Sequence, residues 1–166
     1  MAIDWKYFSL EQINSKEGPE WKLWEQPDNY PSRGLNAFHA AEAARVQGEK
    51  VFNAFHYALL RARHEEKKDI ADPATLIEVA EGVGLEMKRF RNDLSDRRLL
   101  DKLAADHTFA VETLGIFGTP TLGFPGQQAV FLKMSPPPSP EESVAVFEDV
   151  RHLTMDRQQI KEIKRP

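Results

Sequence analysis

The residue types that most often perform chemistry are either missing from this sequence or spaced without a recognisable site. No cysteine occurs among the 166 residues. This excludes a disulfide, a thiolate metal site, a cysteine nucleophile and a Cys-x-x-Cys redox centre within the chain. The glycines show neither G-x-G-x-x-G nor Walker spacing, so no phosphate-binding loop is expected. The aspartates are spaced as helix caps and exposed positions. We therefore expect no catalytic residue and no cofactor.

Histidine is the other common metal ligand and general base, and five occur here: His39, His56, His64, His107 and His152. None forms an H-E-x-x-H motif or a His-x3-His pair on one helical face, so no metal site is predicted. His56 and His107 lie near apolar stripes. Hydrogen-bonded core histidines are the usual occupants of such positions, and this is our interpretation of both.

One loop retains functional potential: Gly118-Thr119-Pro120-Thr121. A bond preceding proline can be cis at a cost of only about 0.5–1 kcal/mol, and a cis bond turns the backbone sharply. In that geometry the carbonyl and N–H of Thr119 would point outward. The alternative is a trans Pro120 that begins an edge strand.

The elements around this loop follow two hydrophobic periods. Ile3, Trp5 and Tyr7 alternate with other residues and predict a strand over residues 2–9. Residues 11–32 contain the turn-forming pairs Gly-Pro and Pro-Ser and predict an irregular segment. The period of two returns in a predicted hairpin, residues 121–124 and 129–132, joined by a Pro-Gly turn.

Between these segments the apolar residues recur every three to four positions, which predicts helices. An alanine-rich helix covers 35–44, a second carries Val51 to Leu60, a third begins at Pro73 after the N-cap Asp72, a fourth carries Met87 and Phe90, and a fifth runs from near Ser95 to a cap at Gly115. A stiff segment at 135–138 precedes a last helix, which opens with a capping box at Ser139 and turns Val146, Phe147, Val150 and Leu153 inward.

Composition and charge set the broad class. The chain is 41% hydrophobic with a net charge of -4, which fits a single domain and predicts neither a nucleic-acid surface nor a disordered tail. We expect one domain over 1–166, with a sheet portion at 1–33 and 114–166 and a helical insertion at 34–113. No run approaches about 18 apolar residues, and the first residues lack a basic region before an apolar one. These patterns predict a cytoplasmic protein that does not enter a membrane.

The order of elements and three segments resemble the DsbA family of thioredoxin-like proteins, in its FrnE-type branch. Residues 55–60 and 69–73 look like that branch's inserted helical domain, residues 104–115 look like its long helix, and Gly118-Thr119-Pro120-Thr121 matches the family's cis-proline motif. The resemblance implies an α/β, thioredoxin-like fold with a large helical insertion. The family's first strand and its Cys-x-x-Cys helix have no counterpart here.

The resemblance also implies function. The family performs thiol–disulfide exchange, so this cysteine-free chain is expected to be redox-inactive. Gly118, Thr119, Pro120 and Thr121 take the position that binds an extended peptide or glutathione. Two alternatives stay open: a glutathione-dependent enzyme like kappa-class transferases and chromene-carboxylate isomerases, or a non-enzymatic peptide-binding or self-association module. The missing strand leads us to expect that the Trp5 strand pairs with the hairpin, or that a second copy completes the sheet as a homo-oligomer.

Overall fold

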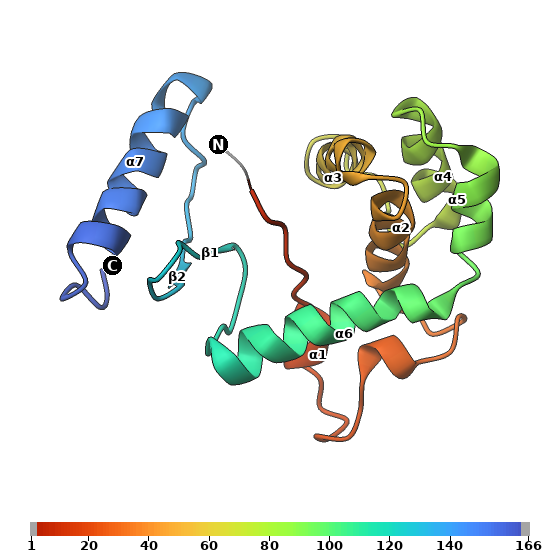
Figure 1. Ribbon diagram of the computed structural model, residues 1–166, viewed down its shortest axis with the longest axis horizontal. Coiled ribbons are helices and arrows are strands. Elements are labelled where there is room, and N and C mark those ends of the chain that lie inside the picture. The colour runs from red at the N-terminus through yellow and green to blue at the C-terminus, as the bar shows by residue number, and fades with distance from the viewer. Residues whose placement is uncertain (1–2, 164–166) are drawn as a thin grey trace. The chain divides into compact units, whose positions relative to one another are not determined.

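The computed structural model describes residues 3–163 (Figure 1). The chain divides into two compact units between Thr108 and Phe109. The first unit contains α1 (Leu10–Ile13), η1 (Leu23–Glu25), α2 (Leu35–Arg45), α3 (Glu49–His64), α4 (Pro73–Gly82), α5 (Met87–Asp93), η2 (Arg97–Leu100) and α6 (Asp101–Thr108). The second contains the π-helix η3 (Phe109–Thr113), β1 (Thr121–Leu122), β2 (Val130–Phe131) and α7 (Pro140–Asp156). The predicted split into a sheet portion and a helical insertion remains a prediction.

The core of the first unit consists of aromatic rings packed against an alanine-rich helix. Phe52 and Phe55 of α3 and Phe90 of α5 are fully buried. Helix α2 presents small side chains to them, because Ala40, Ala43 and Ala44 have no exposed surface, and small side chains allow helices to pack closely. The alanine-rich helix predicted over 35–44 is confirmed as α2.

Helix ends follow the predicted capping chemistry. The Asp72 side chain accepts a hydrogen bond from the Ala74 N–H at 2.9 Å, with Pro73 as the first residue of α4. Ser139 and Glu142 form the reciprocal capping box that opens α7. Gly115 has φ +64°, a left-handed conformation that favours glycine. The helix predicted from Ser95 differs in detail, because it consists of η2, α6 and η3 in succession.

A strand was predicted over residues 2–9, and for residues 3–9 this prediction is wrong. Residue 2 lies outside the described residues. Residues 3–9, the N-terminal strap, form an extended segment that is not a β-strand (Figure 1). Side chains bind its backbone instead. The Tyr7 N–H donates to Asp106 Oδ2 at 3.1 Å, and the Ser9 N–H donates to His107 Nδ1 at 3.1 Å. These contacts satisfy backbone groups that a neighbouring strand would otherwise pair.

The second unit consists mainly of a short hairpin and helix α7. Its two-stranded sheet confirms the predicted hairpin with shorter strands, and Thr121 pairs with Phe131 and Leu122 with Val130. Helix α7 meets the expectation of an inward apolar face only in part. Val146, Phe147, Val150 and Leu153 are only half-buried, and no residue of α7 is fully buried. Across residues 3–163, no helix has the length and apolar character needed to span a membrane.

The His107 contact predicts how stability depends on pH. Burial, and secondarily the charge of Lys22, lower the pKa of His107 in the folded state. The unfolded chain, with a histidine pKa of about 6.5, therefore takes up the proton first. Protonation of Nδ1 also removes the acceptor for the Ser9 N–H. We predict that the free energy of unfolding falls as the pH drops below about 6.5, measured by urea unfolding across pH 5–8.

The variant His107→Asn tests the origin of this slope. An asparagine Oδ1 can still accept from the Ser9 N–H but does not titrate, so the variant should depend less on pH. His56 contributes in the same direction, since burial and the charge of Arg45 lower its pKa, so part of the slope remains. His64→Asn, at an exposed end of α3, is the matched control. An unchanged slope in His107→Asn would contradict the assignment.

Candidate functional site

The predicted site residues Gly118, Thr119, Pro120 and Thr121 form one turn that leads into β1. The bond between Thr119 and Pro120 is cis. Gly118 is buried, Thr119 and Pro120 are exposed, and Thr121 is half-buried. None of the four carries a charge, so any ligand at this turn would be bound by shape, apolar contact and backbone hydrogen bonds.

Two hydrogen bonds fix the turn to the hairpin. The Thr121 hydroxyl donates to the Gly118 carbonyl at 2.7 Å, which closes the turn across the proline. The Leu132 N–H donates to the Pro120 carbonyl at 3.0 Å and extends the pairing of β1 with β2. These two bonds hold Gly118 and Pro120, and thereby fix the position of Thr119 between them.

The backbone of Thr119 is the part of the turn that the protein leaves unused. Among the described residues of the second unit, neither its N–H nor its carbonyl has a hydrogen-bond partner. Both groups sit on an exposed residue, where water satisfies them. An extended peptide can replace that water with a pair of backbone hydrogen bonds, as in strand addition.

Two aromatic rings flank the turn. Phe117 precedes it and is 68% exposed, and Phe131 of β2 is 41% exposed. Their ring centroids lie 5.1 Å apart at an interplanar angle of 47°. Exposed aromatic pairs are unusual on a surface without a partner and supply contact area for an apolar side chain. Sequence reasoning did not select these residues, although Phe117 adjoins the motif.

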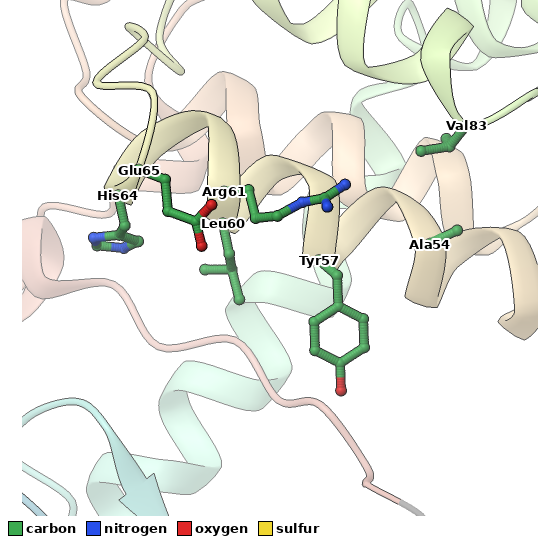
Figure 2. A pocket seen from close by; sticks show the side chains of 7 residues that line it. All are labelled: Ala54, Tyr57, Leu60, Arg61, His64, Glu65 and Val83. Atoms are coloured by element: carbon green, nitrogen blue, oxygen red, sulfur yellow. The ribbon is translucent and has the colours of Figure 1, made fainter. Parts of the chain in front are cut away.

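A second feature lies in the first unit, on α3. A shallow groove there is lined by Ala54, Tyr57, Leu60, Arg61, His64, Glu65 and Val83 (Figure 2). Tyr57 and Leu60 are exposed, and Arg61 and Glu65 lie beside them with opposite charges. None of the predicted site residues lines this groove.

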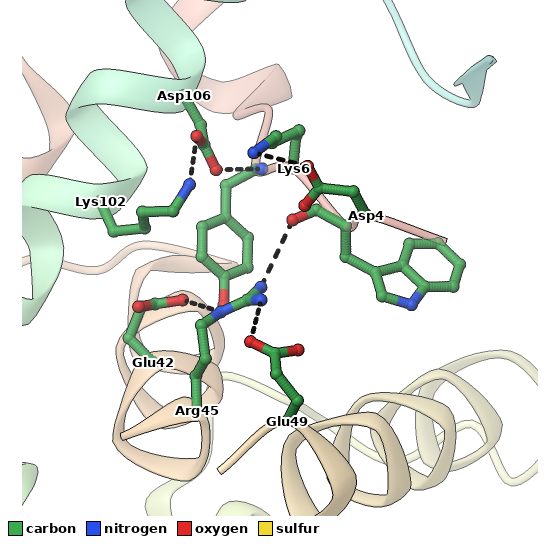
Figure 3. Close-up of polar contacts among 9 residues, drawn as sticks. Asp4, Lys6, Glu42, Arg45, Glu49, Lys102 and Asp106 are labelled. Carbon is green, nitrogen blue, oxygen red and sulfur yellow. Dashed lines mark hydrogen bonds and ion pairs between the residues drawn. The ribbon is translucent and has the colours of Figure 1, made fainter. Parts of the chain in front are cut away.

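The most densely bonded polar cluster is structural. Arg45 contacts Glu42 at 2.7 Å and Glu49 at 3.3 Å (Figure 3). Its guanidinium carbon lies 3.5 Å from the centre of the Phe52 ring. Burial, and then the charge of Glu42, raise the pKa of the neighbouring Tyr7 hydroxyl, which keeps it protonated. Tyr7 therefore cannot act as a base at neutral pH.

The comparisons with known proteins place this geometry in context. A profile of the DSBA-like thioredoxin domain matches residues 9–139, which includes the proline turn and the flanking aromatic pair. The ClpXP adapter protein SpxH of Bacillus subtilis is 30% identical over 124 residues, which is 75% of this chain and 40% of that protein. The Na(+)/H(+) antiporter NhaA 3 of Salinispora tropica is 34% identical over 108 residues, 65% of this chain and 15% of that protein. The chain thus spans less than half of either relative.

The packing of Gly118 under Phe131 gives a test of the turn. A Cβ on Gly118 would lie 3.1 Å from Cε2 of the Phe131 ring, which is closer than normal contact. We predict that Gly118→Val displaces the ring and destabilises the hairpin by about 1–3 kcal/mol, the usual cost of overpacking. NMR signals of β1 and β2 during urea unfolding measure the loss.

The control for this substitution is Gly123→Ala, since a Cβ at Gly123 meets nothing within 4 Å. A double-mutant cycle with Phe131→Ala isolates the contact, because the valine should cost little once the ring is gone. An equal cost of Gly118→Val with and without the Phe131 ring would show that the ring does not constrain this position.

Proposed function

We propose a binding role for this chain, which belongs to the DsbA-like thioredoxin family: it holds an extended polypeptide at Gly118-Thr119-Pro120-Thr121 and performs no redox chemistry on it. The observation that supports this proposal is the unpaired backbone of Thr119 on an exposed turn, next to the rings of Phe117 and Phe131. Backbone pairing supplies affinity for any extended chain, and the rings supply a preference for apolar side chains.

The proposed lack of redox activity rests on the thiol groups that disulfide exchange requires. Exchange of a disulfide requires a thiolate that attacks sulfur and a second thiol that resolves the mixed disulfide. The chain has no cysteine, so neither group comes from its own residues. A polypeptide bound at Thr119 would therefore be held and released unchanged.

The name of one relative supports binding without chemistry. SpxH is named an adapter protein of ClpXP, and that name describes binding to another protein. Because this chain covers 40% of SpxH, an adapter role here is our proposal and not a transfer of the relative's activity. We also propose that the chain associates with a second copy of itself. We further propose that it acts in the cytoplasm.

A binding experiment tests the turn. The probe is an unfolded polypeptide whose thiols have been alkylated, so that only non-covalent contacts can hold it. We predict saturable binding by calorimetry, weakened about threefold to tenfold in Thr119→Pro, which removes one backbone donor worth about 0.5–1.5 kcal/mol. Thr119→Ala keeps both backbone groups and should bind as the unsubstituted chain does. No binding at about 1 mM probe would overturn the proposal.

Two further measurements separate this role from enzymatic ones. The purified chain should reduce insulin no faster than buffer does, and measurable reduction would refute the redox-inactive part of the proposal. Glutathione at millimolar concentration should give no heat of binding. Saturable heat that Thr119→Pro abolishes would instead assign the turn to a glutathione-dependent enzyme.

A further inference from the structure

The N-terminal strap is bound to the first unit along one edge only. Three consecutive odd-numbered residues carry the bonds. The Trp5 carbonyl accepts from Arg45 at 3.4 Å, and the Tyr7 N–H donates to Asp106 at 3.1 Å (Figure 3). The Ser9 N–H donates to His107 at 3.1 Å. In an extended chain, successive residues direct their N–H and carbonyl groups to opposite sides. The odd-numbered residues therefore face the helices.

The other edge of the strap is open. The backbone N–H and carbonyl groups of Asp4 and Lys6 have no hydrogen-bond partner among the described residues of the first unit. Their side chains are 76% and 57% exposed and contact each other at 3.0 Å, while Tyr7 and Ser9 are buried. This alternation is the pattern of an edge strand, with one face against a core and one row of unpaired backbone groups.

We infer that this open edge binds the same strap of a second copy of the chain, in antiparallel orientation, with Asp4 opposite the partner's Lys6. The inference deepens the self-association part of the proposed function and rests on it. A two-fold axis through Trp5 repeats the pair, so Lys6 also lies opposite the partner's Asp4. Both pairs then exchange N–H to carbonyl hydrogen bonds across the axis.

Charge selects the register and the partner. Shifting the pairing by two residues in one direction places Asp4 opposite the partner's Asp4, and in the other direction places Lys6 opposite the partner's Lys6. Like charges directly opposite each other are destabilising, and opposite charges are stabilising. Only the register centred on Trp5 pairs both charges, so the strap is complementary to itself. The contact is short, so the dimer is weak and depends on concentration.

Sedimentation velocity over a range of protein concentrations measures this association. Lys6→Asp places two aspartates opposite one another at both pairs and should raise the dimer dissociation constant at least about tenfold. Asp4→Lys should do the same with lysines. The double variant that carries both substitutions restores opposite charges and should restore the dimer. Lys88→Asp, an equal change of charge on exposed α5, should have no effect.

A backbone variant gives an independent test. Lys6→Pro removes a donor that has no partner among the described residues of the first unit, so the helical content by circular dichroism should be kept while the dimer is lost. A chain that stays monomeric at about 1 mM, or a double charge variant that stays as weak as the single ones, would overturn the inference. Thr119→Pro should leave sedimentation unchanged, which separates failure of this contact from failure of peptide binding at the turn.

Discussion

The constraint on which the structure depends is that every backbone N–H and carbonyl taken out of water needs a partner. The strap lies against the first unit without a neighbouring strand, and side chains of α2 and α6 provide the partners instead. His107 shows how specific this is, because it is buried between the rings of Phe8 and Trp24 and still accepts from the Ser9 N–H. A neutral imidazole in this position holds Ser9, the N-cap of α1, against the helical core.

The same constraint explains what the sequence could predict and what it could not. Helix ends with local signals were predicted correctly, because Asp72, Ser139 and Gly115 act on backbone groups within a few residues of themselves. The hairpin was also predicted, since its pairing is local. The strap has the alternation of a strand, yet whether a strand pairs depends on a distant neighbour, and sequence periodicity carries no information about one. The apolar face of α7 was predicted, but the extent of its burial was not, because burial also depends on distant neighbours.

The proline turn was predicted by residue number, but its surroundings were not. The motif gave the position of Thr119, whereas the exposed Phe117–Phe131 pair arises from the register of β1 with β2. That pair and the unpaired backbone of Thr119 form a surface suited to an extended chain. The two units thus each present unpaired backbone at an exposed position, at Thr119 in one and at Asp4 and Lys6 in the other. Both surfaces would bind by the same physical mechanism, addition of an extended segment.

Hydrogen exchange of single backbone amides in the strap tests this account most directly. Measured by NMR at neutral pH and low protein concentration, the amides of Tyr7 and Ser9 should exchange slowly, because Asp106 and His107 hold them. The amide of Lys6, which directly precedes Tyr7, should exchange rapidly and become protected as the concentration rises. Equal exchange at Lys6, Tyr7 and Ser9 under dilute conditions would contradict a strap bound along one edge and open along the other.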